Sequence, residues 1–102
     1  MANKMEINEG VALFRATPNA ILLDVRNDFE FNQGHIPGSR NLALSLILKE
    51  AEEALPDKSC PLFVYCQSGA RSARSAKLLE LMGYENVTDI GGIAGYQGEK
   101  EK

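Results

Sequence analysis

The feature that most constrains the fold is an alternation of short apolar runs with segments of helical periodicity. Three runs have the length of a strand: Ala20–Val25, Leu62–Cys66 and Val87–Ile90. The first is rich in branched residues and fits a strand that is covered on both faces. Helical segments separate the runs, and this alternation is typical of an α/β domain with a mainly parallel sheet. Binding sites in such sheets form beyond the carboxyl ends of the strands.

Two helices are predicted ahead of the second apolar run. Asn8 can cap a helix through "EGVALFRA", and Ser45 can cap another through "SLILKEAEEAL". Between them, residues 32–41 carry two glycines and a proline, which predicts a loop or a short irregular strand. Side chains at helical spacing are expected to face the core: Val11 and Phe14, with Leu13 as a further candidate, and Leu48, Ala51 and Leu55.

A third helix, "SARSAKLLELM", is predicted after the second run, over residues 72–82. Its apolar stripe comprises Ala76, Leu79 and Met82, and Gly83 stands where a left-handed C-terminal cap is expected. The segment "GGIAGY" indicates a turn into a last helical turn, and residues 97–102 are expected to be a frayed tail.

Length and composition predict a single domain, residues 1–102, with a core over about residues 7–96. The chain has 102 residues, of which 44% are hydrophobic and 25% charged, and its net charge is −3 without a dense basic run. These values favour a globular protein that binds neither nucleic acid nor membranes. No secretory signal or membrane-length apolar run is visible, so we expect a cytoplasmic protein, with a monomer as the default.

The stretch "FVYCQSGARSAR", residues 63–74, places a cysteine where an apolar run ends and a helix is about to begin. The pKa of a free cysteine, about 8.5, falls when the sulfur meets a helix N-terminus or a cation. If the residues from Gln67 to Arg71 curl around the sulfur, their N–H groups form an anion-binding concavity in front of the helix dipole. Gly69 permits such a tight loop, and Arg71 adds positive charge. The pattern favours Cys66 as a thiolate nucleophile that needs no metal or other cofactor.

Plainer interpretations of the same stretch stay open. Cys66 can be an inert, buried strand-end cysteine, and Ser68 and Gly69 can form an ordinary turn. Cys60 precedes Pro61 at the opposite end of the run, about 20 Å away, and is interpreted as a packing residue. The two cysteines lack C-x-x-C spacing and the chain has one histidine, so neither a redox pair nor a metal site is expected.

Three motifs follow one another along the chain: "LLDVRNDFEFNQGHIPGSRNL", "VYCQSGARSA" and "VTDIGGIAGY". Each alone is a weak signal, but the combination is specific and spans residues 21–96. Together the motifs resemble the single-domain rhodaneses, a family of the thiosulfate sulfurtransferase type. The resemblance implies a rhodanese-like α/β fold, with roughly five strands in a mainly parallel sheet and helices on both faces.

The resemblance also implies a chemistry for the cysteine loop. Cys66 would accept a sulfane sulfur from a donor such as thiosulfate and pass it, as a persulfide, to cyanide or a thiol, which splits one hard step into two. Arg71 would bind or steer an anionic donor. The donor and acceptor stay open among thiosulfate, small thiols, thioredoxin and a persulfidated sulfur-relay protein. The residues expected to bind the persulfide through their amides are Gln67, Ser68, Gly69, Ala70, Arg71 and Ser72.

Two other functions compete with sulfur transfer. Related phosphatases and arsenate reductases of this fold carry one more residue in the loop than the four between Cys66 and Arg71, and the larger loop holds a tetrahedral oxyanion. They also have a histidine where this chain has Tyr65, directly before the cysteine. Both differences disfavour an oxyanion enzyme. A persulfide carrier or binding module that serves one dedicated protein partner is the remaining alternative.

Three charged residues of the first motif are candidates for a supporting role. Asp24 can accept hydrogen bonds from the loop amides or pair with an arginine, and as an alternative it is a strand-end turn residue. Arg26 and Glu30 can join Arg71 in a charge network under the site, or form a solvated surface pair, which contributes about 0–1 kcal/mol. By the resemblance, Glu30 is expected to orient Arg71.

Three further positions are interpreted as structural. His35, in "GHIPGS", is expected to be architectural rather than a general base. Arg74 lies one turn beyond Arg71 and is expected on a solvated helix face. The resembling family often has a tryptophan shortly after the Gly-Gly turn, whereas this chain has none, and Gly95 weakens a helix there by about 1 kcal/mol. A short C-terminal helix is therefore expected.

Overall fold

Five parallel strands form one sheet in the computed structural model, which describes residues 2–102. The strands lie in the order β1-β5-β4-β2-β3, and every neighbouring pair is parallel. The predicted fold class is thereby confirmed. The strands are β1 Asn3–Lys4, β2 Ile21–Asp24, β3 Ser39–Asn41, β4 Leu62–Cys66 and β5 Val87–Gly92.

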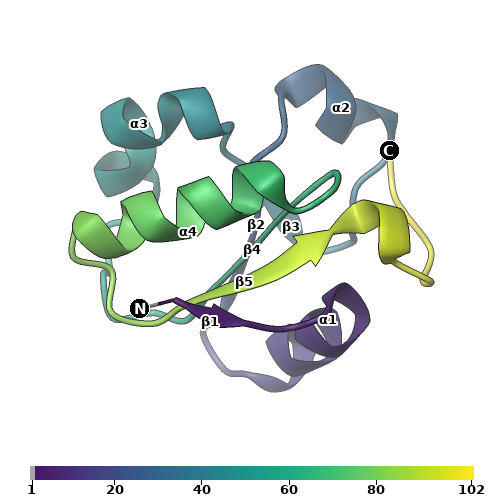
Figure 1. Ribbon diagram of the computed structural model, residues 1–102, viewed down its shortest axis with the longest axis horizontal. Coiled ribbons are helices and arrows are strands. Elements are labelled where there is room, and N and C mark those ends of the chain that lie inside the picture. Colours follow the sequence, from purple (N-terminus) through teal and green to yellow (C-terminus); the bar gives the residue numbers. More distant parts are fainter. Residues whose placement is uncertain (1) are drawn as a thin grey trace.

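Helices cover both faces of this sheet (Figure 1). Helix α1 packs on one face, against β5, β4 and β2, while α4 packs on the other, with α3 beside it. Short 3₁₀ turns, η1 and η2, follow β3 and β5. The bounds are α1 Ile7–Ala16, α2 Asp28–Gln33, η1 Leu44–Leu46, α3 Ile47–Ala54, α4 Ala70–Leu81 and η2 Ile93–Gly95.

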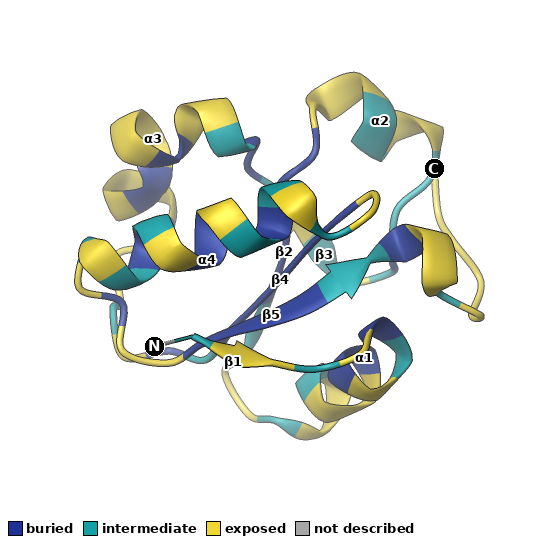
Figure 2. Cartoon of the chain, viewed as in Figure 1, coloured by how far each residue is buried: buried dark blue, intermediate teal, exposed yellow. Residues whose placement is uncertain are grey.

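The central strand β4 is buried along its whole length, because it has a strand on either side and helices above and below (Figure 2). Its side chains alternate between the two faces, as the pleat of a strand requires. Leu62, Val64 and Cys66 join the core cluster under α3 and α4, whereas Phe63 and Tyr65 join the cluster under α1. Cys66 therefore leaves the sheet on the α4 side.

The first helix begins two residues earlier than the sequence suggests. Glu6, not Asn8, is the N-cap residue, since its carboxylate accepts hydrogen bonds from the backbone N–H groups of Asn8 and Glu9. Val11 is buried as predicted, but Leu13 is 44% exposed and points away from the core.

The buried stripe of the helix after β3 contains Ala51 and Leu55 as expected, but not Leu48. The turn η1 precedes this helix, so Ser45 lies within that turn and does not cap α3. Ile47, Ala51 and Leu55 consequently form the buried stripe, while Leu48 is 72% exposed.

Helix α2 was not predicted from the sequence, although Asn27 and Glu30 form a capping box at its start. Helix α4 lies close to its predicted bounds, and Gly83 adopts the expected left-handed conformation with φ of 99°.

The C-terminal segment lies beside α2 (Figure 1). The N–H of His35 donates to the carbonyl of Glu101 at 2.7 Å, and the N–H of Glu101 donates back to His35 at 2.8 Å. This pair forms an antiparallel bridge. The proposed domain limits stay a prediction. The fraying expected for residues 97–102 does not extend to Glu101, because this bridge ties it to His35. Within residues 2–102, no helix combines the length and apolar character needed to cross a membrane.

Candidate active site

Cys66 is the last residue of β4, and the loop that follows folds back over its sulfur. The residue is 1% exposed, and the N–H of Gly69 points at Sγ, with 3.0 Å between the nitrogen and the sulfur. Gly69 holds φ of 106°, which favours glycine, and α4 starts at the next residue. The sulfur therefore faces a peptide N–H at the positive end of a twelve-residue helix. Within residues 2–102, Gly69 supplies the backbone hydrogen bond that the sulfur receives.

The end of β5 supports this loop from the other side, through an irregularity in strand pairing. Asp89 pairs with Val64, but Gly91 pairs with Tyr65 and Gly92 with Cys66, so one residue of β5 is passed over. A Cβ at Gly92 would lie 2.5 Å from the carbonyl oxygen of Gln67, a backbone atom that cannot rotate away. The close approach thus requires glycine at position 92.

A buried polar group ties the helix start to β5. Ser72 Oγ donates to Asp89 Oδ1 at 2.7 Å, and the N–H of Gly91 donates to the same oxygen at 3.0 Å. Ser72 is fully buried and Asp89 is 6% exposed. From the sequence, Ser72 was expected at the site only for its amide, and Asp89 was not expected there. The available signal was an acidic residue in the middle of a buried strand, where an aspartate needs partners.

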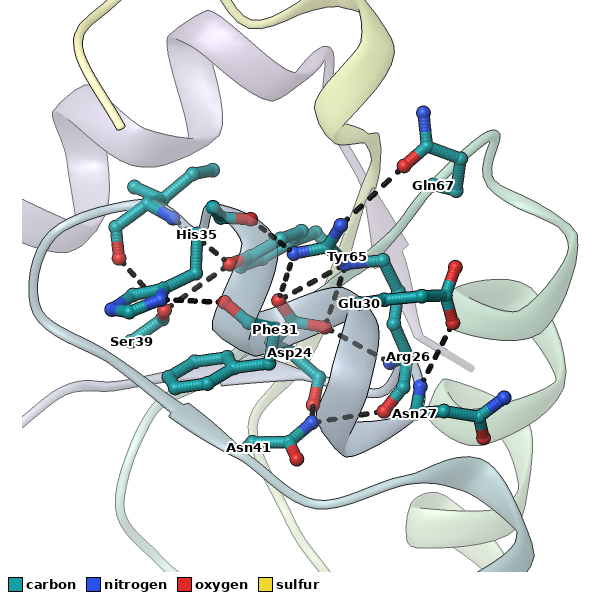
Figure 3. A network of polar contacts seen from close by, with 12 residues as sticks. Asp24, Arg26, Asn27, Glu30, Phe31, His35, Ser39, Asn41, Tyr65 and Gln67 are labelled. Carbon is teal, nitrogen blue, oxygen red and sulfur yellow. Dashed lines mark hydrogen bonds and ion pairs between the residues drawn. The ribbon is translucent and has the colours of Figure 1, made fainter. Parts of the chain in front are cut away.

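Asp24 and Arg26 form a second buried polar group, under the mouth of the loop (Figure 3). Arg26 donates from Nη2 to Asp24 Oδ2 at 2.7 Å and from Nε to both carboxylate oxygens at 3.1 Å. The guanidinium also donates to the carbonyl of Gly34 at 2.8 Å and to Gln67 Oε1 at 3.4 Å. The carboxylate of Asp24 thus accepts hydrogen bonds from Arg26, as the arginine alternative predicts, rather than from an amide of the loop.

The electrostatics of this pair keep the guanidinium charged. Burial works against the charged form of Arg26, but the hydrogen bond and the charge of Asp24 outweigh it and raise the pKa of Arg26. The result is a buried cation directly beneath Gln67, the residue that follows Cys66.

Glu30 and Arg71 meet as a two-pronged ion pair at the side of the loop. The distances are 2.7 Å from Nη1 to Oε1 and 3.0 Å from Nη2 to Oε2. The hydrogen bond from Arg71 lowers the pKa of Glu30 to about 2, against burial that would raise it, and the N–H of Asn27 lowers it further. Helix α2 therefore fixes the guanidinium of Arg71 beside the loop, as the orienting role expected for Glu30 requires.

Three other residues singled out in the sequence lie away from the sulfur. The His35 ring stacks on the Phe31 ring, with 3.7 Å between the ring centroids. Its Nδ1–H donates to the backbone carbonyl of Phe31 at 2.9 Å, and both contacts match an architectural role. Cys60 is buried in the core near the opposite end of β4. Arg74 is exposed on α4.

A surface pocket of about 430 Å³ opens next to the loop. Gln67, the residue after Cys66, lines this pocket, whereas the buried Cys66 does not. Within residues 2–102, no cluster of three or more His, Cys, Asp or Glu side chains is placed to hold a metal ion. The pocket is lined by Arg26, Phe29, Glu30, Gln33, Gly34, Gln67, Ile93 and Lys100.

The sequence model of the Rhodanese-like domain family matches residues 8–99. The chain belongs to this family. Among curated relatives, the thiosulfate sulfurtransferase PspE of Escherichia coli is 34% identical over 71 residues, which cover 70% of this chain and 68% of PspE. The uncharacterized protein YqhL of Bacillus subtilis is 40% identical over 73 residues, 72% of this chain, and the match spans only 56% of YqhL.

A solved structure of a rhodanese with anions from E. coli superimposes on this fold with a TM-score of 0.75. It is 31% identical in sequence, and the match covers 81% of this chain and 98% of that one. The rhodanese-like fold expected from the three sequence motifs is therefore confirmed.

Proposed function

We propose that this rhodanese-like domain is a sulfurtransferase that works through a persulfide on Cys66. The observation that carries the proposal is the Gly69 N–H aimed at Sγ from the first turn of α4. An N–H group in this position stabilises negative charge on sulfur, in the thiolate before transfer and in the persulfide after it. The name of PspE supports thiosulfate as a donor to test first.

The transfer divides into two displacements. The Cys66 thiolate attacks the outer sulfur of thiosulfate, the S–S bond of thiosulfate breaks, and sulfite leaves with the electron pair. The enzyme now holds a Cys–S–S⁻ group. A thiophilic acceptor such as cyanide or a thiolate then attacks the outer sulfur, and the Cys66 thiolate leaves. Both steps move one sulfur atom and require no redox cofactor.

Each supporting group has a part in this scheme. Gly69 and the start of α4 bind the anionic sulfur, and Ser72 with Asp89 holds the loop in place. Arg71, oriented by Glu30, attracts the anionic donor. Arg26, held by Asp24, positions the side chain of Gln67 at the mouth of the loop.

One observation favours a persulfide carrier as the second candidate. Cys66 is 1% exposed, so small acceptors have little direct access to Sγ, whereas a partner that contacts the exposed Gln67 and Ser68 could open the loop. A carrier would load normally from thiosulfate and show little turnover with cyanide. Loading followed by a cyanide assay therefore separates the two candidates.

Intact-mass spectrometry after incubation with thiosulfate tests the proposal. We expect the wild type and Cys60→Ser to gain one sulfur atom each, and Cys66→Ser to gain none. Peptide mapping should place the adduct on Cys66. No adduct with any sulfane donor, in a protein that remains folded by circular dichroism, contradicts both the enzyme and the carrier.

A further inference from the structure

The pocket beside the cysteine loop has three cationic side chains on or near its walls, and two of them are already engaged. Arg26 is held by Asp24, Gly34 and Gln67, and Arg71 by Glu30. Lys100, which lines the same pocket, makes no ion pair with any residue from 2 to 102. It is therefore the cation of the pocket whose charge is available to a ligand.

The position of Lys100 depends on pairing between distant parts of the chain. The two backbone hydrogen bonds between His35 and Glu101, at 2.7 and 2.8 Å, fix the C-terminal segment against the loop that follows α2. The aliphatic stem of Lys100 then packs over Gly34, where a Cβ on the glycine would lie 3.9 Å from Lys100 Cβ and Cδ. On its other side, the carbonyl of Gly34 accepts from Arg26 Nη2. Lys100 and Arg26 thus flank one glycine.

The neighbouring acids do not neutralise this lysine in the structure. The carboxylate of Glu101 lies 3.8 Å from His35 Nε2, and successive side chains of an extended segment point to opposite sides. Glu30, the acid on the pocket wall, is paired with Arg71. Of the charged residues that line the pocket together with Gln67, two are cations, Arg26 and Lys100, and one is an acid, Glu30.

We propose that Lys100 is a specificity-determining residue that recruits anionic sulfur donors, such as thiosulfate, into the pocket beside the cysteine loop. This inference rests on the proposed sulfur transfer and adds a recognition step ahead of it. Lys100 binds the sulfonate end of the donor by charge while the sulfane sulfur advances past Gln67 toward Cys66. Because Lys100 takes no part in the displacement, its removal should weaken donor capture and leave the maximal rate of loading unchanged.

The test measures persulfide loading as a function of thiosulfate concentration in Lys100→Ala and in Lys102→Ala. The second variant removes the same charge from the same segment but lies outside the pocket lining. We expect the half-saturating thiosulfate concentration to rise about threefold to tenfold in Lys100→Ala, because thiosulfate is a dianion facing one exposed cation. Lys102→Ala should stay within twofold of the wild type, and Lys100→Arg should restore most of the lost capture.

Ionic strength and the loading end point complete the design. The difference between wild type and Lys100→Ala should shrink as salt rises from about 0.01 to 0.5 M, because salt screens an exposed charge. The role of Lys100 is overturned if Lys100→Ala and the wild type have equal half-saturating thiosulfate concentrations. It is also overturned if this concentration rises equally in Lys100→Ala and Lys102→Ala. In both cases, full loading of the protein leaves the proposed function standing. A wild type that never loads overturns the proposed function itself.

Discussion

The two ends of β4 each hold a buried cysteine, and their surroundings differ in kind. Cys66 is 1% exposed and Cys60 is 8% exposed, and each lies beside a surface pocket. The pocket lined by Cys60 is the larger, at about 530 Å³ against 430 Å³. Burial raises the pKa of Cys60 and the charge of Asp57 raises it further, whereas the sulfur of Cys66 receives a peptide N–H. Burial and pocket size therefore do not distinguish the thiol that we propose to be reactive, whereas the groups that face each sulfur do.

A single methyl group added to Gly92 on β5 should disrupt the loop that follows Cys66. In Gly92→Ala the new Cβ would lie 2.5 Å from Gln67 O and 2.8 Å from Ser68 Cα, so the backbone of the loop must shift. We expect persulfide loading to fall by more than tenfold and the free energy of unfolding to drop by about 1–3 kcal/mol. Mass spectrometry and urea denaturation measure the two effects.

Gly95→Ala is the matched control for this substitution. A Cβ there would meet Ile7 Cγ2 at 3.6 Å, an ordinary contact, so loading should stay near the wild-type rate. Normal loading in Gly92→Ala would mean that the close approach of β5 does not hold the loop.

The ion pair Glu30–Arg71 near Cys66 and the ion pair Glu52–Lys58 near Cys60 should contribute differently to stability as the pH falls. Glu30 has a folded-state pKa of about 2, below its ordinary value of 4.5, so its pairing stabilises the fold fully above pH 4.5 and less as the pH falls toward 2. We expect Glu30→Gln to lower the free energy of unfolding at pH 7 by about 1–2 kcal/mol, after allowance for solvent screening of Arg71. Denaturation at a series of pH values should show this difference closing below pH 4.

Glu52→Gln provides the comparison at the Cys60 end. Glu52 and Lys58 pair at 2.6 Å, but the side chain of Glu52 is 66% exposed. We expect Glu52→Gln to show a smaller loss than Glu30→Gln over the same pH range. Equal losses in the two variants would remove the distinction between a built site and a surface pair.

The smallest effect is expected from the other cysteine. Cys60→Ala removes one sulfur from the packed cluster under α3 and α4, which should cost about 1 kcal/mol, as for a buried methylene. Loading of Cys66 and its dependence on thiosulfate should not change. A fall in loading would show that the far end of β4 is coupled to the loop, and would weaken the contrast between the two thiols.

The parts that the sequence predicts well are those decided by neighbours in the chain. The run Leu62–Cys66 has the same bounds as β4, and the motif after it brings Gly69 over Cys66, with Arg71 in the first turn of α4. The resemblance further suggested that Glu30 and Arg71 would meet, and the structure brings them together. Local periodicity and a specific motif suffice for these statements.

The parts that were missed depend on contacts between distant segments. Asp89 acquires its role through a hydrogen bond from Ser72 on α4, which lies 17 positions away in the chain. Leu48 was assigned to the core because a 3₁₀ turn ahead of α3 leaves no clear sign in the sequence. Lys100 reaches the pocket because its neighbour Glu101 pairs with His35 through the backbone, and such pairing carries no side-chain signature.

Ile90, the residue of β5 that is passed over in the pairing with β4, separates two parts of the strand. Up to Asp89 the strand is ordinary core, and its apolar side chains could be exchanged for others of similar volume. Beyond Asp89, Gly91 lies opposite Tyr65 and Gly92 lies opposite Cys66. In a regular ladder, Ile90 and Gly91 would take these two positions instead. The irregularity in the sheet therefore decides which residue of β5 lies against the loop after Cys66, and that residue is Gly92.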